Sequence, residues 1–193
     1  FSSKDSCLTL YQDPILWNGN QQLLGEEIMV YMNDSTIDWA HIQNQALSVE
    51  RLDSLNYNQV SGKDMKAYFE GGEMKQVDVI GTVRLVYKTK KKDSTLLGMN
   101  YSETSQLSMF LENRKLKKMS MSPKANGTLY PMTQIPPAKM KLDNFVWFDY
   151  VRPLSKEDIF VWRGKGVGQE LKKSTRGAAP LPNQKLFENT KKK

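Results

Sequence analysis

Apolar and polar residues alternate in three stretches of this chain, and the three stretches are copies of one pattern. The segment that begins at Gln22 returns at Gln59 with a constant shift of 37 positions, and a third copy follows at a shift of 42. Alternation with period two predicts a strand with one buried face. Polar turn residues at 33–35 and 70–72 divide the first two copies, and the third is divided in the same way, so each copy predicts a strand, a turn and a second strand. The copies cover about 22–48, 59–85 and 101–127.

The inward positions of the three copies define one continuous apolar face. In each copy three alternating residues come before the turn, and further apolar residues follow it. Repeats that stack side by side bury such a face in common. The predicted inner face consists of Ile28, Val30, Met32, Ile37, Ile42, Met65, Ala67, Phe69, Met74, Val77, Val79, Leu107, Met109, Leu111, Leu116, Met119 and Met121.

The second strand of each copy contains one irregular step. In the first copy the spacing of apolar residues slips from two to three between Ile37 and Ala40, and the same step recurs in the other two copies. A recurring step of three predicts a β-bulge that bends the strand. Tyr31, Tyr68 and Phe110 hold matching positions on the opposite face, where we expect them to lie as cross-strand neighbours on the outside of the sheet.

The apolar face is compatible with two arrangements. It is either the closed core of a β-sandwich or short β-solenoid, or the inner face of a curled sheet that stays partly open and holds a long apolar ligand. Methionine recurs on the face, and its flexible side chain suits irregular ligands and irregular cores alike. The pattern alone leaves both arrangements open.

Several motifs resemble a known family in their order along the chain. They are Gln22-Leu-Leu-Gly-Glu-Glu-Ile28, Tyr57-Asn-Gln-Val-Ser-Gly62, Ala67-Tyr-Phe69, Gly72-Glu-Met74, Gly98-Met-Asn100, Gly127-Thr-Leu-Tyr-Pro131 and the run from Asn144 to Phe160. Over roughly Asp5 to Phe160 the chain resembles the OstA-like proteins of Bacteroidetes-type bacteria. These are similar to LptA and the N-terminal domain of LptD, which transport lipopolysaccharide. The chain departs from compact LptA proteins in its long aromatic segment after the third copy and in its basic tail.

The resemblance implies an all-β fold, a β-taco or β-jellyroll in which a folded-over antiparallel sheet holds lipid A acyl chains. It implies a non-catalytic lipid-binding role in the periplasm, with an outer-membrane association as one option, and it makes the inner-face residues the lipid contacts. The expected partners are lipopolysaccharide and other β-jellyroll proteins of the transport bridge, joined through edge strands. The alternative is a closed-core structural scaffold or envelope interaction module without a lipid ligand.

Charge adds a second candidate site. The net charge of +7 implies affinity for anions, which include nucleic acid, anionic lipid and lipopolysaccharide phosphates. A basic loop is predicted at 88–94, in which Lys88, Lys90, Lys91 and Lys92 are candidate anion contacts. It is either a solvated hairpin tip that blocks an edge or a clamp for phosphate groups. We do not expect nucleic acid as a partner, because the repeats lack exposed aromatic residues interleaved with Lys and Arg.

The C-terminal third differs in composition from the repeats. We expect residues 1–162 to form one domain that ends in an aromatic cap over 128–162, followed by a basic, flexible tail over 163–193. The segment from Phe145 to Val151 is apolar on both faces and predicts a doubly buried strand. It is expected to cap the open end of the sheet or to dock against a partner. Ser155 is a candidate N-cap for a short helix.

Chemistry-bearing residues are sparse. The chain has one histidine, His41, which falls between inward positions and is expected to point outward, and one cysteine, Cys7, which reads as a plain strand residue. No catalytic triad or metal-ligand cluster can be assembled around them. The sequence therefore predicts no enzyme activity, no cofactor and no metal.

Overall fold

The computed structural model describes residues 6–33, 36–90, 95–155 and 157–161. In these ranges the chain forms strands and short 3-10 helices, as the all-β prediction requires. The strands are β1 (Cys7–Tyr11), β2 (Ile15–Asn18), β3 (Gln21–Leu24), β4 (Glu27–Asn33), β5 (Thr36–Gln43), β6 (Leu47–Arg51), β7 (Tyr57–Ser61), β8 (Asp64–Glu70), β9 (Glu73–Lys90), β10 (Leu96–Glu112) and β11 (Lys115–Pro131). The 3-10 helices are η1 (Met132–Gln134), η2 (Pro137–Lys139), η3 (Asp149–Val151) and η4 (Glu157–Phe160).

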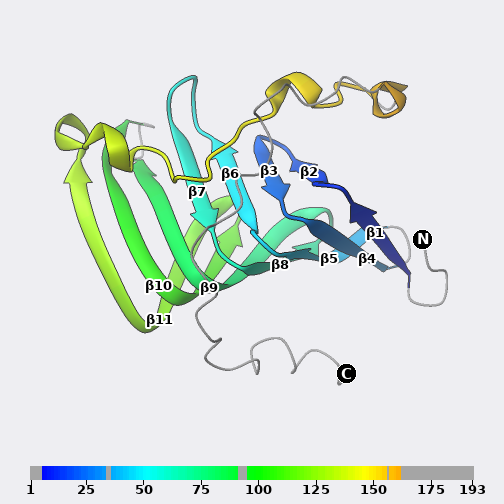
Figure 1. The fold of residues 1–193 in the computed structure, drawn as a ribbon, viewed down its shortest axis with the longest axis horizontal. Helices are drawn as coiled ribbons and strands as arrows, with labels where there is room; N and C mark the ends of the chain where they lie inside the picture. Colours follow the sequence, from blue (N-terminus) through cyan, green and yellow to red (C-terminus); the bar gives the residue numbers. More distant parts are fainter. Residues whose placement is uncertain (1–5, 34–35, 91–94, 156, 162–193) are drawn as a thin grey trace.

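The strands form one antiparallel sheet that is folded into two halves (Figure 1). The first half-sheet contains β2, β3, β6 and β7, and the second half-sheet contains β1, β4, β5 and β8. The long strands β9, β10 and β11 pass through both halves. Strand β9 pairs with β8 along its first part and with β7 along its last part. The result is the curled, folded-over antiparallel sheet that the family resemblance implied.

Glycines lie where the chain crosses from one half-sheet to the other, along a fold line. A Cβ added to Gly25 would overlap a side chain of the adjacent strand and lie 3.0 Å from the carbonyl oxygen of Gln43. A Cβ added to Gly62 would meet the same obstruction, with the carbonyl oxygen of Ile80 at 3.0 Å. The two positions are equivalent in the repeat. Each needs glycine because a neighbouring strand lies against it.

The predicted bulges occur in all three copies. The register shifts between Tyr31 and Met32, between Tyr68 and Phe69, and again at the matching step of β10. In each copy the extra residue lies on the second strand, as the spacing predicted, so Tyr68 and Phe69 point to opposite faces of the sheet. Two short strands, β1 and β2, come before the first repeat, and Cys7 is a buried residue of β1, as expected of a plain strand residue.

A segment without regular strands, residues 132–151, crosses the outer face of the first half-sheet (Figure 1). We call it the strap. The strand predicted from Phe145 to Val151 is wrong, since Phe145 to Phe148 form no strand and η3 follows. Of the segment 128–162 expected to form the aromatic cap, residues 128–131 belong to β11. The strap therefore covers a face of the folded sheet.

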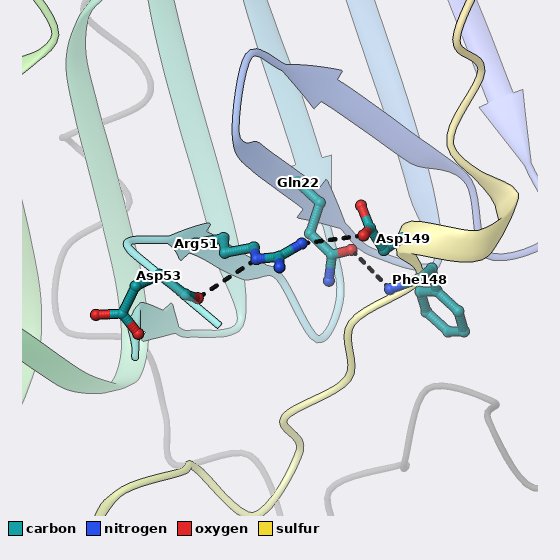
Figure 2. Close-up of polar contacts among 5 residues, drawn as sticks. All are labelled: Gln22, Arg51, Asp53, Phe148 and Asp149. Atoms are coloured by element: carbon teal, nitrogen blue, oxygen red, sulfur yellow. Dashed lines mark hydrogen bonds and ion pairs between the residues drawn. The ribbon is translucent and has the colours of Figure 1, made fainter. Parts of the chain in front are cut away.

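Two buried glutamines hold the strap by its backbone. The amide of Gln22 donates from Nε2 to the carbonyl of Val146 and accepts at Oε1 from the N–H of Phe148, at 2.5 and 3.1 Å. Figure 2 shows the second of these contacts, together with the ion pair between Arg51 and Asp149 at 3.1 Å. Here side-chain amides take the place of a neighbouring strand as partners of the strap backbone.

Gln59 forms the equivalent clamp on β7. Its Nε2 donates to the carbonyl of Met140 at 2.9 Å, and its Oε1 accepts from the N–H of Leu142 at 2.8 Å. Arg84 adds an ion pair to Asp143 at 2.7 Å. Between these polar contacts the strap packs on the sheet through a cluster that includes Leu24, Leu47, Val49, Val86, Met99, Leu142 and Phe148.

The chain continues beyond the strap only briefly in the described residues. The N–H of Asp158 donates to Ser155 Oγ at 3.4 Å, so Ser155 does precede a helical turn, but that turn is the short 3-10 helix η4. The predicted tail at 163–193 lies outside the described residues, as do Lys91 and Lys92 of the basic loop.

Candidate functional site

The main candidate site is the interior between the two half-sheets. One hydrophobic cluster fills it, and that cluster contains every residue of the predicted inner face except Met32. The period-two pattern thus identified the inner wall of the second half-sheet correctly. Whether these residues contact lipid stays a prediction.

The opposing wall comes from the first half-sheet. Leu23, Val60 and Leu85 are buried in the same cluster, and Leu16 and Tyr87 pack against it. We did not predict these residues as part of the site. The available signal was the repeat itself, because Leu23 and Val60 hold equivalent positions two residues before the repeated glycines Gly25 and Gly62.

Exposure increases with distance from the fold line. Ile42 and Met65, near the fold line, are 0% exposed, whereas Phe69 and Met32, toward the hairpin ends, are 9% and 37% exposed. Exposure also increases toward the edge strand β11, where Met119 and Met121 are only half-buried. The interior is therefore tightly packed along the fold line, and its apolar wall becomes accessible toward the hairpins and toward β11.

The inner face of the first half-sheet becomes polar toward its free end. Beyond the row of Leu23, Val60 and Leu85, the next inward row carries amides and a carboxylate. We call these residues the polar row: Gln21, Glu50, Asn58 and Asn100, with Tyr87 beside them. Burial, and secondarily the Glu50 carboxylate, raise the pKa of the Tyr87 phenol.

The outer face of the second half-sheet carries an aromatic row. Tyr31 and Trp39 stack with ring centroids 3.9 Å apart, and Trp39 and Tyr68 lie 6.5 Å apart. Tyr31, Tyr68 and Phe110 are on the outer face as predicted, but they are not direct cross-strand neighbours. Trp39 lies between the two tyrosines, and Gln76 lies between Tyr68 and Phe110. Sequence reasoning missed Trp39 because it is next to the bulge, where the period is interrupted.

His41 belongs to the same outer face, as predicted. Its ring nitrogen Nδ1 lies 3.2 Å from Gln43 Nε2. Burial lowers the pKa of His41, and the nearby Asp64 carboxylate opposes that effect. Among the described residues, no group of His, Cys, Asp and Glu side chains is arranged to hold a metal ion.

The basic candidates divide into two kinds. Lys88 lies within β9, not in a loop as expected, and its side chain is buried on the strap side with Nζ 3.4 Å from the carbonyl oxygen of Tyr57. Burial lowers the pKa of Lys88. Lys90, at the end of β9, is exposed. An anion contact therefore stays a prediction for Lys90, while Lys88 is enclosed by the fold.

Comparisons with known proteins bear on the fold. No protein-family model matches the sequence, and no curated protein matches it. A solved structure is similar: LptH of Pseudomonas aeruginosa, described as the LptA-homologous periplasmic component of the lipopolysaccharide transport device. The match has a TM-score of 0.51 at 10% sequence identity, and it covers 68% of this chain and 89% of LptH. The chain has an LptA-like β-jellyroll fold. In the described residues we find no helix of the length and apolarity needed to span a bilayer.

Proposed function

We propose that this protein is a non-catalytic lipid carrier that shields acyl chains between its two half-sheets. The observation that carries the proposal is the change in exposure along one apolar wall, from 0% at Ile42 to 37% at Met32. This apolar wall is packed at the fold line and accessible toward the hairpin ends, which we call the rim, so acyl chains can lie against it at the rim. Each buried methylene contributes about 0.8 kcal/mol, so burying about ten methylenes offsets a large part of the free-energy cost of association.

Lipopolysaccharide is the proposed lipid, and the periplasm, in association with the outer membrane, is the proposed location. The support is the fold that the chain shares with LptH, together with the sequence motifs that resemble OstA-like proteins. The inner-face residues nearest the rim, among them Met32, Phe69 and Leu111, would contact the acyl chains first. Exposed lysines such as Lys90 are available for anionic groups outside the interior.

Other β-jellyroll proteins of a transport bridge are the proposed protein partners. Among the described strands, β11 pairs only with β10, and at the other end of the sheet β1 pairs only with β4. Such edges present backbone donors and acceptors to an added strand. Pairing of β11 with the edge of a neighbour would align the two apolar interiors and provide a continuous path for a lipid.

A closed-core scaffold is the competing function. It is favoured by the complete burial of Ile42, Met65 and Leu107, which shows that the base of the interior is filled by protein. The two functions differ in what occupies the rim. A scaffold would close the rim with its own side chains in solution, whereas a carrier would leave it to lipid.

Photo-crosslinking separates the two functions. A photoreactive amino acid at position 69 should crosslink to lipopolysaccharide when the protein is purified from its native envelope, because Phe69 lies on the inner wall. The same group at position 68 points to the outer face and serves as the matched control. Mass spectrometry of organic extracts should find acylated lipid with the wild-type protein. Equal crosslinking at both positions, or no lipid in the extract, would refute the carrier.

A further inference from the structure

The two inner walls differ in chemistry near the free ends of the half-sheets. The wall of the second half-sheet remains apolar out to Met32, Phe69 and Leu111. The wall of the first half-sheet changes to the polar row, in which Glu50 and Asn58 are cross-strand partners. The rim of the interior therefore has one apolar lip and one hydrogen-bonding lip.

The polar row is internally ordered. Asn58 Nδ2 donates to Glu50 Oε2 at 2.8 Å, and Asn58 Oδ1 accepts from the backbone N–H of Lys88 at 2.8 Å. Gln21 Nε2 donates to Ser48 Oγ, and Ser102 Oγ donates to Asn100 Oδ1, both at 2.8 Å. These contacts fix the amides and the carboxylate in place. A fixed set of polar groups recognises a ligand at a smaller entropic cost than mobile side chains do.

The charge on the inner faces is of one sign. At the paired strand positions of the described chain, the inner faces carry no lysine or arginine, and Glu50 is their one carboxylate. Basic residues such as Lys88, Arg84 and Arg51 lie on the outer face of the first half-sheet. A phosphate placed at the polar row would meet a like charge, and the described inner-face positions supply no cation to balance it, which is strongly unfavourable.

We propose that the polar row is the subsite for an uncharged hydrogen-bond donor of the bound lipid, a hydroxyl or amide N–H, and that it excludes phosphate from the interior. This inference rests on the proposed carrier function and specifies which part of the lipid enters. Glu50 accepts a hydrogen bond from the donor, and a carboxylate forms stronger hydrogen bonds than a neutral acceptor does. The lipid chains lie against the apolar lip, and the charged groups of the lipid remain outside.

The test uses two single-chain probes of equal length, n-dodecyl glucoside and n-dodecyl phosphate, titrated into the whole protein below their micelle concentrations. The wild-type protein should bind the glucoside at least about tenfold more tightly than the phosphate. Glu50→Gln keeps the shape of the side chain and removes its charge, so the phosphate should bind about tenfold more tightly than before. Glu26→Gln removes the same charge from an exposed position near the fold line and should leave both affinities unchanged.

One further variant and three further probes identify the donor group. Asn100→Leu removes a member of the polar row without changing the charge. It should weaken binding of the glucoside and leave the binding of n-dodecane unchanged. Methyl tetradecanoate and its 3-hydroxy derivative separate a hydroxyl on the chain from a hydroxyl on the sugar. Tighter binding of the hydroxy ester places the donor on the chain, and equal binding of the two esters places it on the sugar.

The outcomes distinguish this inference from the carrier function. Equal affinity of the wild-type protein for glucoside and phosphate, or affinities that Glu50→Gln leaves unchanged, would overturn the subsite while the carrier stands. If neither probe nor lipopolysaccharide binds, the carrier function itself fails. A circular dichroism spectrum of each variant shows whether the protein is folded.

Discussion

Gln22 and Gln59 hold the strap in the same manner although they lie 37 positions apart in the sequence. Each side chain donates to one strap carbonyl and accepts the N–H of the residue two positions further on, which is Phe148 for Gln22 and Leu142 for Gln59. Both glutamines are buried, at 0% and 1% exposure. The repeat therefore reproduces a buried glutamine contact on the outer face as well as the apolar pattern on the inner face.

Removing either clamp should destabilise the protein. Gln22→Leu leaves a buried N–H and a buried carbonyl of the strap without their partners, and an unsatisfied buried group costs about 1–3 kcal/mol. Gln59→Leu should have a similar effect. Unfolding in urea, monitored by tryptophan fluorescence, measures the change. Gln134→Leu is the exposed control and should shift the unfolding free energy by less than about 0.5 kcal/mol. Clamp variants as stable as this control would show that the two glutamine clamps do not stabilise the fold.

Gly62→Ala should also destabilise the protein, because the added methyl group overlaps Val79 at the fold line. Overpacking of this kind costs about 1–3 kcal/mol. Val79→Ala in the same chain removes the overlapping atom, so the double variant should lose less stability than the sum of the two single changes. Thermal melts of the four proteins complete the cycle. Strictly additive effects would contradict the close packing of Gly62 against β9.

Phe69→Asp distinguishes an open interior from a closed core. In an open interior, water reaches the new carboxylate once the lipid has left, so the protein stays folded and loses its lipid. In a closed core the same charge has no solvent and should cost several kcal/mol. Met74→Asp repeats the test on the adjacent strand, and Ser120→Asp, on the exposed side of β11, is the control. Melting temperature and lipid content are measured together. Unfolded Phe69→Asp and Met74→Asp variants beside a folded control would exclude the open interior.

Lys88 and Lys90 should respond differently to substitution. Lys88→Met preserves the packing of a buried stem and removes a charge that burial disfavours, so stability should be unchanged or higher. Lys90→Ser changes an exposed residue and should alter the unfolding free energy by less than about 0.5 kcal/mol. Chemical denaturation provides both values. A large loss of stability in Lys90→Ser would mean that the hairpin end is structural.

His41 predicts a pH dependence with a defined sign. Its folded-state pKa is lowered, mainly by burial, with Asp64 raising it and Lys66 lowering it further. The unfolded chain therefore binds the proton more readily than the folded protein does. Stability should fall as the pH decreases from about 6.5 toward the lowered pKa, and it should be independent of His41 above that range. His41→Gln should flatten the curve of unfolding free energy between pH 7.5 and 5.5. An unchanged slope would contradict the assignment.

The second half-sheet was predictable from the sequence because its strands are long and only one face of each strand is apolar. The three bulges were recognisable because each interrupts the same period at the same place, as the step from Ile37 to Ala40 illustrates. The first half-sheet was harder to predict, since strands such as β3 contain too few residues for a period to emerge and Gln22 faces the strap. The strap forms no strand and so has no strand period, and the glutamine contacts to its backbone from Gln22 and Gln59 leave no pattern in the strap sequence.

The two clamps also imply an order of events during folding. Gln22 contacts a strap residue 124 positions away, and Gln59 contacts one 81 positions away. Contacts between such distant residues form slowly, because the intervening chain must first be brought together. The clamps are aligned only after β3 and β7 have paired with β6 in the correct register. We therefore expect docking of the strap to be a late step. In a nascent chain whose repeats have slipped by one residue, Gln22 would point inward and the strap would stay undocked and open to proteolysis.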